Sequence, residues 1–104
     1  MQHAVIAHLR LIEDPFGSER EREIIADLTS ELQHAINVGN VGEFDGEEFG
    51  GGKCVIYMYG PNADQLFAVV EPILCATPLA RGGFAIKRYG EAKDLNAAEV
   101  KVGL

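Results

Sequence analysis

The residues best placed for chemistry are four carboxylates on one short segment, Glu43, Asp45, Glu47 and Glu48. Alternate residues of an extended strand point to one side at steps of about 7 Å. Glu43, Asp45 and Glu47 are therefore expected to form a row. Like charges at that spacing raise one another's proton affinity and attract a cation or a basic partner. We call these four residues the acidic hairpin.

Three interpretations of the acidic hairpin remain open. The first is a contact surface for a basic protein. The second is part of an oxygen-ligand site for a hard cation, or a set of carboxylates for acid–base catalysis. The third is a solvated edge of a sheet, kept charged to discourage pairing with another strand.

Other residue types that carry chemistry are scattered. His3 and His8 differ by five positions, so they fall on opposite faces of a strand, and His34 lies on a predicted helix. No histidine or cysteine spacing matches a zinc site. The only two serines, Ser18 and Ser30, lie outside any Gly-x-Ser-x-Gly elbow. We therefore expect no catalytic residues, no bound metal and no cofactor.

Two glycine-rich segments resemble nucleotide-binding patterns only superficially. The glycines at 50–52 precede a strand rather than a helix, which predicts a hairpin turn and not a phosphate loop. Residues 81–87 resemble an RNP1 octamer, but Phe84 is their only aromatic residue. Nine basic and sixteen acidic residues give a formal charge of −7, which repels nucleic acid and anionic membranes. Neither is expected as a partner.

The elements that position these residues are two helices and five strands. Ser18 and Glu21 match a capping box, and apolar residues recur every four positions behind them up to Gly39. Asn62 opens a second helix, in which Pro72 predicts a kink or an early end. Alternating apolar residues predict strands over residues 3–12, 41–49, 53–59, 84–89 and 98–104.

This order predicts one domain over residues 1–104, an α+β ferredoxin-like β-α-β-β-α-β sandwich. Two helices cover one face of an antiparallel sheet, and the last segment adds an edge strand. The other face has no helix to cover it and carries Tyr57, Tyr59 and His8. An aromatic face of this kind is a binding surface, a dimer interface or a half-polar face that tolerates water, and we expect a homodimer.

The remaining patterns indicate a cytoplasmic protein. Arg10, Glu13 and Asp14 interrupt the first apolar run too early for a signal peptide, and no run is long enough to span a bilayer. Cys54 and Cys75 lie in apolar segments without redox or metal spacing, so we expect both to be reduced core residues.

A resemblance to known domains covers about half the chain. It lies in Gly42-Glu43-Phe44-Asp45-Gly46, in the segment from Tyr57 to Asp64 and in Arg88-Tyr89-Gly90. These segments resemble small, mostly uncharacterised bacterial domains of ferredoxin-like type. More distantly, the acidic character and the Asp45-Gly46 pair are similar to the ribonuclease E inhibitor B family. That resemblance implies the same fold and a role in binding another protein.

Three functions follow as hypotheses. The first is a non-enzymatic protein-binding module, of inhibitor or immunity type, whose acidic hairpin contacts a basic protein surface. The second is a regulatory domain that binds a small ligand on the uncovered sheet face or at a dimer seam, lined by Tyr57, Tyr59 and His8. The third is an enzyme that uses carboxylates or a metal.

Overall fold

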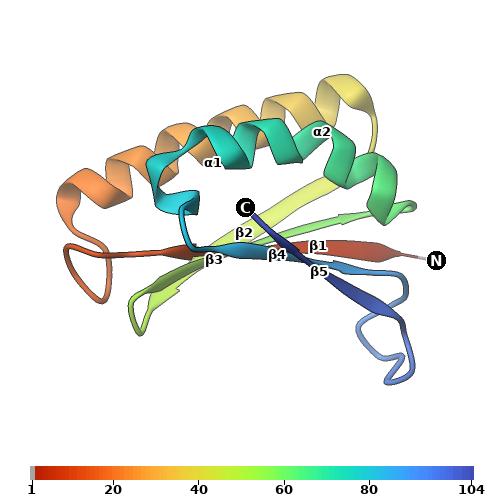
Figure 1. The fold of residues 1–104 in the computed structure, drawn as a ribbon. Helices are drawn as coiled ribbons and strands as arrows, with labels where there is room; N and C mark the ends of the chain where they lie inside the picture. Colours follow the sequence, from red (N-terminus) through yellow and green to blue (C-terminus); the bar gives the residue numbers. More distant parts are fainter. Residues whose placement is uncertain (1) are drawn as a thin grey trace.

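The chain forms a five-stranded sheet with two long helices, and the computed structural model describes residues 2–104 (Figure 1). The elements are β1 (His3–Arg10), α1 (Glu19–Gly39), β2 (Glu43–Gly50), β3 (Lys53–Gly60), α2 (Ala63–Ala76), the 3-10 helix η1 (Pro78–Ala80), β4 (Phe84–Arg88) and β5 (Glu99–Gly103).

The strand order in the sheet is β2-β3-β1-β4-β5, and every neighbouring pair is antiparallel. Both helices lie on the same face of the sheet (Figure 1). The predicted α+β ferredoxin-like fold is therefore confirmed, including the extra edge strand β5. Within residues 2–104, no helix is both long and apolar enough to cross a membrane.

The core lies between the sheet and the helices. Alternate residues of the two central strands face it and are fully buried: Val5, Ala7 and Leu9 from β1, and Cys54, Ile56 and Met58 from β3. The helices supply stripes of the predicted kind, such as Leu32 and Ile36 from α1. Each such large aliphatic side chain contributes about 1.5–3 kcal/mol on burial. This packing fixes which face of every strand is left outside.

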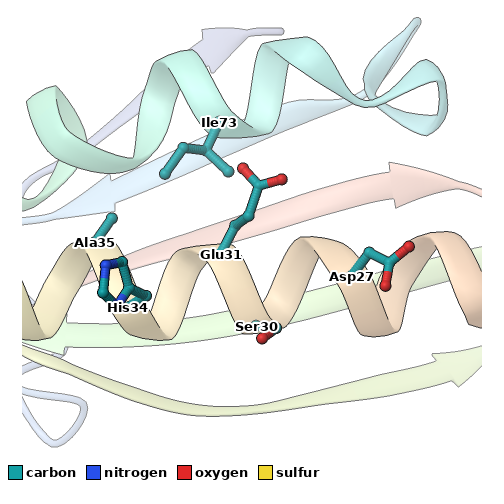
Figure 2. Close-up of a pocket in the computed structure, with 6 residues that line it drawn as sticks. All are labelled: Asp27, Ser30, Glu31, His34, Ala35 and Ile73. Atoms are coloured by element: carbon teal, nitrogen blue, oxygen red, sulfur yellow. The ribbon is translucent and has the colours of Figure 1, made fainter.

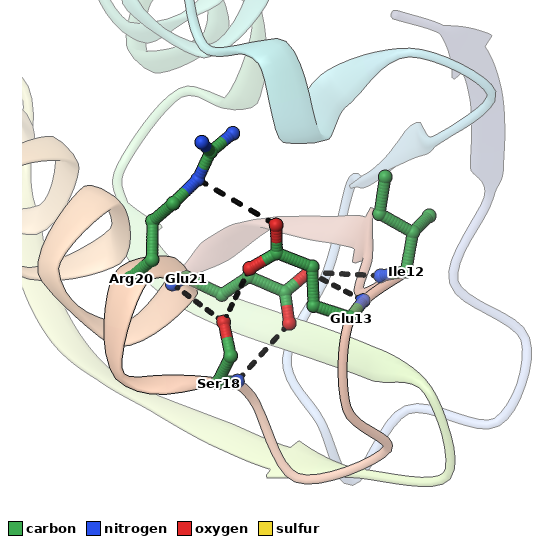
Figure 3. Close-up of polar contacts among 5 residues, drawn as sticks. All are labelled: Ile12, Glu13, Ser18, Arg20 and Glu21. Carbon is green, nitrogen blue, oxygen red and sulfur yellow. Dashed lines mark hydrogen bonds and ion pairs between the residues drawn. The ribbon is translucent and has the colours of Figure 1, made fainter.

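The start of α1 is held by the predicted capping box. The Ser18 hydroxyl accepts a bond from the Glu21 amide, and the Glu21 carboxylate accepts one from the Ser18 amide, both at 3.1 Å. The same carboxylate accepts bonds from the amides of Ile12, at 2.8 Å, and Glu13, at 3.2 Å (Figure 3). Glu21 is only 1% exposed, so one buried carboxylate ties the β1–α1 loop to the helix.

Helix α2 contradicts part of the prediction made from Pro72. Asn62 caps it as expected, accepting a bond from the Gln65 amide at 3.0 Å. The helix then continues through Pro72 to Ala76, so the early end was wrong. Proline removes its own amide donor and crowds the carbonyl oxygen of Ala68, four residues earlier. The burial of Val70 and Leu74 on either side of it holds the helix in place.

The two cysteines have different environments. Cys54 is buried in the core, and this burial raises the pKa of its thiol to about 12. Cys75 is exposed, so the prediction of a core position was wrong. The buried stripe of α2 runs through Leu66, Val70 and Leu74 at steps of four, and Cys75 lies one residue off that stripe. Both thiols are free, as expected.

The first prediction concerns Glu21. Replacing it with Ala leaves three amides of the β1–α1 loop and helix start without their acceptor, which should cost about 2–4 kcal/mol of unfolding free energy. Urea denaturation measures this cost. The exposed Glu23 on the same helix provides the control, since Glu23→Ala should change stability by less than about 0.5 kcal/mol.

The pH dependence of the same residue provides a second measurement. Burial raises the pKa of Glu21, but the bonds from Ser18, Ile12 and Glu13 outweigh burial and lower it below its ordinary 4.5. A lowered pKa stabilises the fold above the unfolded value and loses that contribution as pH falls through the folded value. The stability gap between the wild type and Glu21→Gln should therefore shrink below about pH 4.5. A constant gap down to acid unfolding would contradict this account.

Candidate functional site

The candidate site lies on the sheet face that points away from the helices, which we call the open face. Directly paired residues of antiparallel strands share a face, so the register assigns its members. They form rows across β2, β3, β1, β4 and β5: Glu43, Tyr59, Ala4, Arg88, Glu99; then Gly46, Tyr57, Ile6, Ile86, Lys101; then Glu48, Val55, His8, Phe84, Gly103; and last Gly50, Lys53 and Arg10.

A bulge in β2 changes the predicted arrangement of the acidic hairpin. The register shifts between Phe44 and Gly46, so Asp45 occupies the bulge. Glu47 pairs with the inward-facing Ile56 and thus lies on the helix side of β2. The predicted row of Glu43, Asp45 and Glu47 was therefore wrong.

The cause of the bulge can be read in the sequence. Phe44 pairs with Met58 and Phe49 pairs with Cys54, so both phenylalanines face the core. They are five positions apart, and strict alternation would put them on opposite faces. One extra residue between them lets both rings pack inward. The odd spacing of the two phenylalanines is therefore the sequence signal for the bulge, and a prediction from strict alternation misses it.

The bulge leaves two carboxylates beside the tyrosines of the open face. Glu43 is opposite Tyr59, and Glu48 is opposite Val55, one row from Tyr57. The Tyr57 hydroxyl donates a hydrogen bond to Glu48 at 3.4 Å. Burial and the nearby Glu48 carboxylate raise the pKa of Tyr57. The β2 side of the open face is therefore an acidic border along an aromatic surface.

A cavity of about 690 Å³ lies at the end of the open face near the first row. Its floor includes Ala4, Ile6, Tyr57 and Tyr59, and the loop at residues 90–97 supplies the wall. In Figure 1 this loop lies on the side of the sheet away from the helices. A volume of about 300–1,000 Å³ accommodates a drug-sized molecule or a large side chain.

Arg88 holds the loop that forms the wall. Its guanidinium donates to the carbonyl oxygens of Glu91, at 3.1 Å, and of Asp94. It also forms an ion pair with the Glu99 carboxylate at 2.8 Å. The cavity is thus built before any ligand arrives. Leu95, which is 94% exposed, lies at the cavity rim.

The opposite end of the open face is basic, which sequence reasoning missed. Arg10 pairs with Lys53 across β1 and β3, and both are exposed. His8 stacks on Phe84 with ring centroids 4.5 Å apart, and the Lys101 ammonium lies 4.1 Å from the Phe84 centroid. Among the ion pairs of residues 2–104, none contains Arg10, Lys53 or Lys101. The sequence signal for this basic end was His8 and Arg10 at alternate positions of one predicted strand, with Lys53 on another.

The helix layer carries a second hollow, but its polar groups do not converge. A groove of about 570 Å³ runs between α1 and α2 and is lined by Asp27, Glu31, His34 and Ile73, among others. In Figure 2 its polar side chains are spread along one side of α1. Across residues 2–104, no three His, Cys, Asp or Glu side chains are placed to hold a metal ion. The described lining of the groove therefore includes no three-ligand metal set.

Comparisons with known protein families, with curated proteins and with solved structures give no match to this chain. The features that bear on function are therefore those of the open face itself: its acidic border, its aromatic centre with a cavity, and its basic end.

The basic end generates a prediction about His8. Partial burial lowers its pKa below the ordinary 6.5, and the positive charges of Lys53 and Lys101 lower it further. Replacing both lysines with Gln should move the His8 midpoint upward, which an NMR titration of its ring protons measures. Lys93→Gln, at the far end of the face, should leave it unchanged. An unmoved midpoint in the double variant would show that these lysines do not act on His8.

The cavity wall generates a prediction about Arg88. Hydrogen bonds of a charged donor contribute about 1.5–3 kcal/mol each, so Arg88→Ala should speed amide exchange in residues 91–97 at least about tenfold. Exchange in the core strands β1 and β3 should change much less. Arg81→Ala, which removes an exposed arginine outside the cavity, is the matched control. Equal exchange rates in all three proteins would mean that Arg88 does not hold the loop.

Proposed function

We propose that this chain is a non-enzymatic protein-binding module, of inhibitor or immunity type, whose open face binds a basic segment of another protein. The observation that carries the proposal is the position of Glu43 and Glu48 on the same face as Tyr57 and Tyr59. Carboxylates beside half-buried aromatic rings form a surface that suits lysine and arginine side chains.

The charges of the acidic border are available to a partner. Glu43 and Glu48 are exposed, and neither belongs to an ion pair within residues 2–104. Asp45 and Glu47 are exposed on the same strand and extend the negative potential around the edge of the sheet. A formal charge of −7 adds long-range attraction for a basic partner and speeds its association.

The aromatic centre and the cavity supply the apolar part of the contact. Tyrosine is enriched at the energetic centres of protein interfaces, where a partner inserts a side chain into a desolvated pocket. Tyr59, which lines the cavity, lies in the same row as Glu43. A partner segment with an apolar residue next to a lysine or arginine would fill both. The resemblance to the ribonuclease E inhibitor B family agrees with such a role.

The cavity also favours a second candidate, a regulatory domain that binds a small ligand. Its floor is apolar and its wall is held by Arg88 before binding, as in many small-molecule sites. A ligand at 100 times its dissociation constant stabilises the fold by about 2.7 kcal/mol, which a thermal-shift screen of metabolites detects. Ligands that bind here should lose their effect in Tyr59→Ala. If no metabolite in a broad panel stabilises the protein, the small-ligand candidate is rejected and the protein-binding proposal remains.

The main proposal predicts the effect of charge reversal at the acidic border. Glu43→Lys with Glu48→Lys should abolish capture of the partner from a native cell extract at low salt. In the wild-type protein, capture should fall as salt rises, because exposed charges are screened. Quantitative mass spectrometry of the captured proteins, with immobilised wild type and variant, measures both effects.

The control carries the same change of net charge on the helix side. Glu23→Lys with Glu31→Lys reverses two exposed carboxylates of α1 and should capture the same proteins as the wild type. If both double variants lose the partner equally, net charge explains the binding. If neither loses it, the acidic border is not the binding surface.

A further inference from the structure

The open face has opposite charges at its two ends, although the chain as a whole is acidic. Glu43 stands in the first row, beside Tyr59. Lys53 and Arg10 form the last row, at the other end of the same strands. The rows between them are mainly apolar or aromatic, and Ala4, Ile6 and Tyr57 are buried or half-buried even though no helix covers them. A surface of this kind matches itself when one copy is reversed end for end.

The register shows what such a reversal brings together. Two open faces related by a twofold axis that crosses the strands place the first row of one copy on the last row of the other. Glu43 then lies over the second copy's Gly50, and Tyr59 lies over its Lys53 on the next strand, so Glu43 reaches that lysine across one strand spacing. The two middle rows also exchange, so Glu48 lies over Gly46. A Cβ built on Gly46 meets nothing within 4 Å, so space for the Glu48 side chain exists there.

The loop at residues 90–97 decides between the two possible axes. It stands on the open side of the sheet near the first row, outside β4 and β5 (Figure 1). In the last row those two strands have no residue, because β4 begins at Phe84 and β5 ends at Gly103. An axis that crosses the strands puts the loop over this corner, where the turn at residues 81–83 lies beside the Arg10 side chain. An axis along the strands would instead bring Glu43 against Glu99.

The area of the face suits a dimer of modest affinity. Neighbouring strands lie about 4.8 Å apart and alternate residues about 6.8 Å apart, so the face covers roughly 590 Å² in projection. The relief of its side chains and the loop adds accessible surface. A standard protein–protein interface buries about 800 Å² on each partner. The open face is therefore near the size that a specific dimer needs.

We infer that the open face binds the open face of a second copy of this chain, as a twofold dimer whose axis crosses the strands. Contacts between Glu43 of one copy and Lys53 of the other close each end of the interface, and the apolar rows form its centre. The same surface serves the proposed partner, so a bound partner displaces the second copy. The inference does not depend on that partner, because the two occupants are measured separately.

The experiment is a charge swap followed by sedimentation equilibrium of the full chain from about 1 to 200 µM. Wild type should fit a monomer–dimer equilibrium. Glu43→Lys and Lys53→Glu, each alone, should weaken the dimer at least about tenfold, because each places like charges in contact. The double variant, Glu43→Lys with Lys53→Glu, restores opposite charges and should recover most of the affinity. Circular dichroism confirms that all four proteins are folded.

Each outcome decides the matter. A monomer throughout the concentration range overturns the inference and leaves the capture experiment with the extract unaffected. If both single variants dimerise with the affinity of the wild type, the dimer uses another surface, and this result also overturns the inference. Single losses without recovery in the double variant contradict the Glu43–Lys53 contact and the axis. Glu23→Lys, on the helix side, is the control and should dimerise like the wild type.

Discussion

The inward packing of Phe44 and Phe49 determines the chemistry of the uncovered side of the sheet. Both rings pack against the core from an edge strand, and their odd spacing requires one extra residue between them. That residue, Asp45, breaks the alternation and sends Glu48 to the open face while Glu47 faces the helix side. Without the bulge, Glu43, Asp45 and Glu47 would form one row on a single side of β2, and Glu48 would lie on the other side. With it, two of them border the tyrosines of the neighbouring strand.

The helix layer imposes the second constraint. The chain forms two amphipathic helices, and their apolar stripes cover one face of the sheet. The apolar side chains of the other face must then be shielded from water without a helix. They are shielded in part by close packing, since Ala4 is only 3% exposed, and in part by the loop at residues 90–97, which Arg88 holds across the cavity from the tyrosines. The remaining apolar surface is what a partner or a second copy would cover.

The fold could be predicted because it depends on regular periodicity. The four-residue stripes of the helices, the capping pairs at Ser18 and Asn62 and the glycine turn after β2 all lie where the patterns indicate. The errors lie where tertiary packing overrides a local rule. Pro72 does not end α2, because buried neighbours hold the helix, and Cys75 is one position off the buried stripe. The site was predicted only in part, since a bulge and a strand register decide which charged residues share a face.

The two proposed occupants of the open face are distinguished by the range over which charge acts. Between two copies, each with a formal charge of −7, long-range electrostatics are repulsive, and only contact between opposite ends of the face is attractive. A basic partner is attracted both during its approach and in contact. Beyond a Debye length of about 8 Å at physiological ionic strength, both long-range effects are largely screened. Approach therefore favours the basic partner, while self-association depends on close complementarity of the two ends. In the proposed dimer this asymmetry would protect the apolar centre of the face and still let the proposed partner displace the second copy.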